Sequence, residues 1–221
     1  IEPLHDVNSK SSAVFGQFSI QPDDTLKLTA GFRSTNDEKD AVGGTKVQIR
    51  PPCGGSFCWV NVGSQSYSPE DSWSSGTYRL GIDKYINDDR MVYASMSTGY
   101  RAGGFNFGVS SAESYDPEEL TAFEIGSKNR FNDGRMQLNA TVFYYDYTDM
   151  QVFQVVDQTI VIRNASEADI SGAELEFVAA LSDNLRVDAS LGLLEAEYKK
   201  FILPSNLFLD AAGDPTNIDV S

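Results

Sequence analysis

Four side chains with ligand-binding chemistry surround a pair of glycines in the middle of the sequence. They are Arg101, Phe105, Asn106 and Tyr115. A guanidinium suits an anionic or carboxylate-bearing ligand, and aromatic rings can stack on a bound molecule. The alternative is that these residues pack their loop against a part of the protein outside this chain. A ligand site is expected where strand residues of the polar face meet the longer loops.

The sequence contains no recognisable catalytic or metal-binding constellation. His5 is its single histidine, and it has no G-x-S-x-G, phosphate-binding glycine loop or H-E-x-x-H. Cys53 and Cys58 enclose two glycines, and zinc would need two further ligands. We expect these cysteines to form a disulfide in an oxidising compartment, with free thiols as the alternative. No enzyme activity, metal or cofactor is predicted.

The chain is acidic. It has 32 acidic and 17 basic residues among 221, a net charge of -15, and 41% hydrophobic residues. That balance repels a phosphate backbone, so nucleic acid is not expected as a partner. No stretch approaches the ~20 apolar residues of a membrane helix, and residues 1–6 include neither Met nor a signal peptide's apolar region. We expect a fragment of a longer protein.

Alternation of apolar and polar residues predicts an all-β, antiparallel fold, because successive side chains of a strand point to opposite faces. A helix is the alternative for residues 166–181, which include good helix formers, but Gly172 and the continuing alternation favour a strand. About eight long strands are predicted. Their alternating runs are residues 13–20, 25–33, 77–85, 90–101, 120–131, 136–145, 173–181 and 185–193.

The connections between these runs alternate in length. Short Asp/Asn turns stand near residues 22, 88, 133 and 183, whereas residues 34–74 and 103–117 read as long loops, with a possible short strand at 46–50. Several runs reach the ~9 to 11 residues that cross a bilayer at a tilt. Short turns at one end and long loops at the other are typical of transmembrane barrels. A soluble β-sandwich is the alternative.

The two faces of the predicted strands differ in charge. Tyr78, Tyr100 and Tyr144 lie toward strand ends on the apolar face, where interfacial aromatic residues sit in membrane barrels. The polar face carries charges of both signs that could pair around an aqueous lumen. These are Lys27, Arg33, Arg79, Asp83, Glu124, Lys128, Glu174, Glu176, Arg186 and Asp188.

Several runs resemble the barrel of TonB-dependent outer-membrane receptors, in the family's order and over most of the chain. They are LTAGFR (28–33), YASMSTGYRAGGFN (93–106), YDPE (115–118), FEIGSK (123–128), NATVFYYDYTDMQ (139–151) and SGAELE (171–176). The resemblance implies a barrel of about 22 strands around an N-terminal plug. It also implies import of a ferric siderophore or another scarce nutrient with energy from the inner membrane.

On this resemblance, residues 1–221 are expected to be part of the barrel domain, without the plug. The implied location is the bacterial outer membrane. The implied partners are the lipid bilayer and lipopolysaccharide, a small ligand, and a TonB-type energy transducer that acts through the plug. The segment from Cys53 to Trp59 would then stiffen an external loop. Alternatives are a non-transporting barrel in an outer-membrane assembly and a soluble β-sandwich binding protein. Loops that vary on one scaffold leave the ligand unnamed.

Overall fold

A computed structural model describes residues 2–53, 56–107, 112–156, 159–209 and 215–219, and all regular structure in these ranges is β-strand. Eight of its strands are long. They are β1 (Glu2–Asp23), β2 (Leu26–Ile49), β6 (Glu70–Asn87), β7 (Arg90–Arg101), β10 (Glu118–Phe131), β11 (Met136–Val156), β12 (Thr159–Ser182) and β13 (Leu185–Leu209). The short strands are β3 (Pro52–Cys53), β4 (Ser56–Phe57), β5 (Val60–Tyr67), β8 (Gly104–Phe107), β9 (Ala112–Tyr115) and β14 (Pro215–Asp219).

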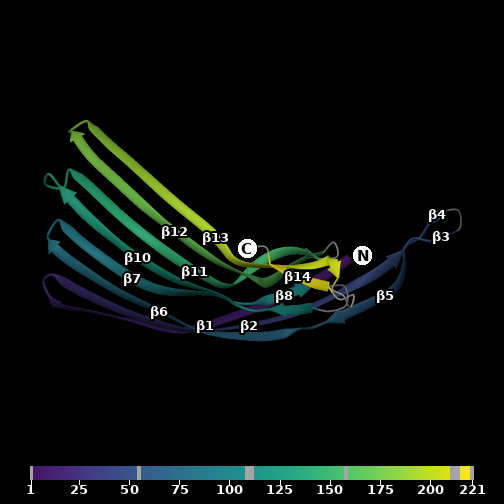
Figure 1. Ribbon diagram of the computed structural model, residues 1–221. Helices are drawn as coiled ribbons and strands as arrows, with labels where there is room; N and C mark the ends of the chain where they lie inside the picture. Colours follow the sequence, from purple (N-terminus) through teal and green to yellow (C-terminus); the bar gives the residue numbers. More distant parts are fainter. Residues whose placement is uncertain (1, 54–55, 108–111, 157–158, 210–214, 220–221) are drawn as a thin grey trace.

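The long strands form one antiparallel meander. Its order is β1-β2-β6-β7-β10-β11-β12-β13-β14, and β5 adds to β2. Figure 1 shows a single curved layer, with tight turns at one end and the longer connections at the other. We call these the turn end and the loop end. The predicted all-β antiparallel fold is confirmed. Within the described ranges, no helix is long and apolar enough to span a membrane.

Short polar side chains close the turn end. The Asp23 carboxylate accepts hydrogen bonds from the Thr25 backbone N–H at 2.7 Å and the Thr25 hydroxyl at 2.6 Å. These bonds lower the pKa of Asp23. Asn132, Asp133 and Gly134 adopt positive φ angles of 53°, 54° and 82°, which Asn, Asp and Gly tolerate better than other residues. Turn chemistry written in the sequence therefore sets where β10 turns into β11.

The strands extend further toward the loop end than their alternation predicts. The long loop predicted at residues 34–74 is wrong, because β2 continues to Ile49 and β5 and β6 pair with it. Both faces are polar here, so hydrophobic alternation gives no signal, yet the backbone ladder continues. Asn36 and Ser74 are partners in this ladder, and the Ser74 hydroxyl also donates to the Asn36 side-chain oxygen at 2.8 Å. The possible strand at 46–50 is the end of β2.

Two other expectations are corrected or decided. The predicted loop at 103–117 contains the β8–β9 hairpin. The helical alternative for residues 166–181 is wrong, because these residues belong to β12 and pair with β13 over most of their length. Residues 157–158, between β11 and β12, lie outside the described residues.

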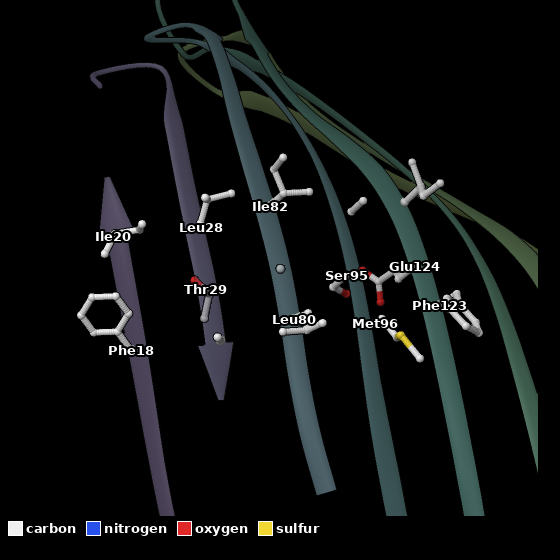
Figure 2. Close-up of a pocket in the computed structure, with 14 residues that line it drawn as sticks. Phe18, Ile20, Leu28, Thr29, Leu80, Ile82, Ser95, Met96, Phe123 and Glu124 are labelled. Atoms are coloured by element: carbon white, nitrogen blue, oxygen red, sulfur yellow. The ribbon is translucent and has the colours of Figure 1, made fainter. Parts of the chain in front are cut away.

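The strand register gathers the apolar side chains on one face. Ile82 pairs with both Leu28 and Ala94, and Ile125 pairs with both Ala94 and Val142. Ile82, Ile125 and Val142 remain 44%, 60% and 53% exposed. In Figure 2, apolar side chains from β1 to β10 line a hollow of about 560 Å³. No second layer of described residues covers this face, as one would in a sandwich.

The apolar face ends in charge toward the loop end. The Lys199 ammonium lies 2.6 Å from Asp169 and 3.5 Å from Asp146, and it donates to the Tyr144 hydroxyl at 3.3 Å. Tyr144 thus marks the boundary between the apolar band and a charged zone above it. Aromatic residues occupy such boundaries in membrane barrels because one end of the ring is apolar and the other polar.

Glycines on the polar face accept aromatic rings from neighbouring strands. The Tyr93 ring covers Gly126, and its hydroxyl donates to Glu124 at 2.6 Å and lies 3.1 Å from the Thr141 hydroxyl. The Phe143 ring covers Gly172 on β12 in the same way. Because glycine has no side chain, Gly126 and Gly172 leave room for aromatic rings that reach over them from the neighbouring strand.

A methyl group at Gly172 is expected to destabilise the protein. A Cβ there would lie 2.6 Å from the Leu193 carbonyl oxygen and would also meet the Phe143 ring, so backbone must move. We expect Gly172→Ala to lower the free energy of unfolding by about 1–3 kcal/mol, measured by urea titration of the complete protein. The matched control is Gly192→Ala on β13, where nothing lies within 4 Å of the added atom. Equal stability of the two variants would contradict the steric argument.

Candidate functional site

The β8–β9 hairpin stands at the loop end, directly after β7, and its entry depends on two buried glycines. A Cβ at Gly103 would lie 2.6 Å from a ring atom of Trp73, and one at Gly104 would lie 2.5 Å from the Tyr115 hydroxyl. Side chains at these positions would collide with both rings. The glycine pair therefore lets the hairpin fold closely onto β6 and onto its own second strand.

Trp73 anchors the hairpin from β6. It is only 8% exposed, and the Phe105 ring lies 6.2 Å from it. Lys39 on β2 also contacts Trp73. Its ammonium lies 5.6 Å from the Trp73 ring centroid and donates to the Gly103 carbonyl oxygen at 2.5 Å. A cation placed between a ring face and a carbonyl is attracted by both. Lys39 and Trp73 together attach the hairpin to the β2–β6 part of the sheet.

The aromatic contacts continue along the hairpin. The Phe107 ring lies 6.4 Å from Phe105 and stacks on Tyr67 of β5 at 6.2 Å, with 20° between the two planes. Burial raises the pKa of Tyr67, so its phenol stays neutral near pH 7. Together with Trp73, these uncharged rings connect β5, β6 and β8 at the loop end.

Side-chain amides hold the hairpin on its other side. Asn106 donates to the Ile162 carbonyl oxygen and accepts from the Ile162 backbone N–H, both at 2.7 Å. Gln151, 9% exposed, donates to the carbonyl oxygens of Ala102 at 3.1 Å and Asp116 at 2.9 Å. An amide carries both donors and an acceptor, so it can replace the missing strand partner of a backbone edge.

Asn164 on β12 completes this set, which we call the amide clasp (Asn106, Gln151 and Asn164). Its oxygen accepts the Asp116 backbone N–H at 2.8 Å. Its nitrogen lies 2.8 Å from the Asp116 oxygen, 3.1 Å from the Pro117 oxygen and 2.7 Å from the Asp149 oxygen. Asp149 has a φ of 51°, at a break in the β11–β12 register that brings its carbonyl to Asn164.

The four predicted ligand residues thus have different surroundings. Phe105, Asn106 and Tyr115 pack and hydrogen-bond within the loop end, against other strands of this chain. Arg101 is exposed, and it has no hydrogen-bond or ion-pair partner among the described residues. Its guanidinium is the group available to a ligand. A binding role for all four residues stays a prediction.

Sequence reasoning missed Lys39, Trp73, Gln151 and Asn164. The first two lie in the stretch that was predicted to be a loop, and the last two lie beyond the alternating runs of β11 and β12. The glycine pair at 103–104 was the available signal, because glycines without a turn indicate a close neighbour. It does not say which residue that neighbour is.

Cys53 and Cys58 are joined by a disulfide in the small β3–β4 hairpin. Their Cα atoms lie 5.9 Å apart, within the usual range for a disulfide. The Cys58 backbone N–H also donates to the Pro51 carbonyl oxygen at 3.1 Å. Beside the hairpin, Trp59 is 66% exposed and Arg50 lies 5.6 Å above its ring.

A family model described as "TonB dependent receptor-like, beta-barrel" matches residues 3–217. The chain belongs to this family. Among curated relatives, a probable TonB-dependent siderophore receptor, PiuA, of Acinetobacter baumannii is 27% identical over 143 residues, covering 61% of this chain and 19% of the relative. The pesticin receptor of Yersinia pestis is 28% identical over 125 residues, covering 55% of this chain and 18% of the receptor. The chain spans about a fifth of these relatives.

Solved receptors share the fold. The ferric yersiniabactin uptake receptor FyuA from Yersinia pestis superposes with a TM-score of 0.72 at 16% identity, covering 92% of this chain and 33% of that one. The siderophore receptor PiuA from Acinetobacter baumannii gives 0.70 at 21% identity, covering 96% and 28%. The single-layer sheet is therefore a segment of such a barrel wall, and closure is not expected of a segment.

Removal of one amide of the clasp is expected to loosen the hairpin. Asn164→Ala leaves the Asp116 N–H and the carbonyl oxygens of Pro117 and Asp149 without this side-chain partner, while the Asp116 carbonyl oxygen keeps only Gln151. We expect about tenfold faster hydrogen exchange over residues 112–117, followed by mass spectrometry on the complete receptor. Asn8→Ala is the control, since Asn8 makes one exposed bond to Asp40. Unchanged exchange in Asn164→Ala would show that the clasp does not hold the hairpin.

The disulfide predicts a mass change. Intact mass spectrometry of receptor isolated without reductant, and after alkylation, should show no labelled cysteine at positions 53 and 58. Prior reduction should add two labels. Reduction is also expected to speed proteolysis next to Trp59, because the six-residue ring restrains the β3–β4 hairpin. Labelling of both cysteines without reductant would contradict the pairing.

Proposed function

We propose that this chain is part of the wall of an outer-membrane receptor that imports a scarce nutrient, such as a ferric siderophore, with energy from the inner membrane. One observation carries the proposal: a one-layer antiparallel sheet whose apolar face is uncovered while its other face is charged. Lipid would cover the first face, and an aqueous lumen would lie along the second. A non-enzymatic role agrees with a family of receptors.

The polar face suits a water-filled interior. Ion pairs join Lys27 to Asp83 at 3.8 Å across β2 and β6, and Arg186 to Asp188 at 2.7 Å along β13. Exposed ion pairs of this kind contribute little to stability, so their main effect is to keep this face hydrated. The charged zone around Lys199 would lie at the level of lipid headgroups or lipopolysaccharide.

The loop end would capture the ligand. Its hairpin is held by the amide clasp and by Trp73, and Arg101 ends β7 directly before this hairpin. Rigid placement lowers the entropy cost of binding. Capture would be followed by displacement of a plug in the remainder of the protein, which a TonB-type transducer would contact. Relatives named as siderophore receptors support this ligand class.

Uptake measurements in a strain that lacks the receptor gene test the proposal. The strain, complemented with the complete receptor, is offered radiolabelled ferric complexes of catecholate, hydroxamate and carboxylate siderophores. We expect energy-dependent uptake of at least one. Arg101→Gln should raise the half-saturating concentration about tenfold with little change in maximal rate, because the guanidinium acts in capture.

Arg163→Gln on β12 is the matched control, an exposed arginine at the same end of the sheet. Heat-modifiable mobility of the receptor in gels verifies its insertion as a barrel. A correctly inserted receptor that takes up none of these complexes would overturn the siderophore assignment. A receptor without heat-modifiable mobility would overturn the barrel itself.

A further inference from the structure

Backbone pairing between β6 and β7 stops partway along the two strands. The β6–β7 ladder ends where Arg79 pairs with Ser97, and the next backbone N–H, of Tyr78, donates instead to the Thr98 hydroxyl at 3.0 Å. Beyond this point β6 continues beside β2 and β7 continues beside β10. A hydroxyl thus replaces the ladder at the seam. The seam contributes residues 77–79 and 97–98 to a hollow of about 340 Å³.

Two guanidinium groups line this hollow from adjacent strands. Arg79 lies opposite Gly31, and Arg33 lies opposite Thr77, so the two arginines are diagonal neighbours on one face. Diagonal neighbours in an antiparallel pair are about 7–8 Å apart, within reach of a common ligand for side chains this long. Gly31 has no side chain to fill the space between them.

Phe15 completes the wall of the hollow. The Arg33 guanidinium carbon lies 5.7 Å from the Phe15 ring centroid, and its Nε donates to the Thr35 hydroxyl at 3.0 Å. These contacts orient one edge of the guanidinium and leave its terminal nitrogens without a described partner. The ring is 74% exposed although it lies on the polar face. An apolar surface therefore adjoins the two cations.

Neither arginine has a carboxylate partner among the described residues, in a chain with 32 acidic and 17 basic residues. Lys27 and Arg186 on the same face do have one. Two adjacent cations repel each other, and a shared anion removes that repulsion. Guanidinium forks bind carboxylates through paired hydrogen bonds.

We propose that Arg33 and Arg79 form a carboxylate-binding site in the barrel wall, with Phe15 packing on the apolar group that carries the carboxylate. The proposal rests on the proposed function, because it requires the polar face to line the lumen. The carboxylate has two possible sources of the same chemistry. One is a free carboxylate-bearing ligand in the lumen, and the other is an Asp or Glu of the part of the protein that fills the barrel.

The experiment compares the complete receptor with the double variant Arg33→Gln and Arg79→Gln, and with each single variant. Arg186→Gln is the matched control, a cation of the same face that already pairs with Asp188. Citrate binding is measured by isothermal titration in detergent micelles. Release of the barrel-filling part is measured as the urea midpoint at which limited protease cleaves it.

About tenfold weaker citrate binding in the double variant, with Arg186→Gln unchanged, supports a site for free carboxylates. No citrate binding to the wild type, with a lower urea midpoint in the double variant alone, supports a carboxylate from the barrel-filling part. Citrate binding that the double variant leaves intact, or no effect in either measurement, overturns the inference. Heat-modifiable mobility of the wild type separates these results from a failure of the proposed function.

Discussion

The antiparallel ladder that joins β1 through β13 is the constraint on which the rest of this structure depends. A sheet in lipid has no water to satisfy its backbone, so each N–H and C=O must pair with a neighbouring strand. The ladder also sets the faces, since a slip of one residue would move every apolar side chain to the other side. Pairs such as Ile125 with Val142 keep the apolar band continuous.

Where the ladder is interrupted, polar side chains take over its hydrogen bonds. Thr98 accepts the Tyr78 N–H at the seam between β6 and β7. Asn164 accepts a hydrogen bond from the Asp116 N–H and donates one to the Asp116 carbonyl oxygen, where the β8–β9 hairpin meets β12. These interruptions lie toward the loop end, and both candidate binding regions are found there. Irregular backbone is tolerated where side chains or water can satisfy it.

The polarity of the two faces changes along the length of the ladder. Near the turn end one face is apolar and the other polar, whereas toward the loop end both faces are polar. Among the described residues, burial is limited to small contacts, such as Trp73 against the β8–β9 hairpin. The sheet is therefore stabilised by strand pairing and by its environment, and it has only a small hydrophobic core.

The sequence by itself determined the strands that have one apolar and one polar face, their turns and their family. Alternation in runs such as 136–145 and turn residues such as Asn132 are local signals. Only the tertiary structure decided the rest. The polar halves of β2 and β6 carry no periodicity, and the partners of Gly103, Asn164 and Arg79 come from strands far away in the sequence. Register and the parting of strands place those residues together, because contacts across a sheet depend on pairing and not on sequence distance.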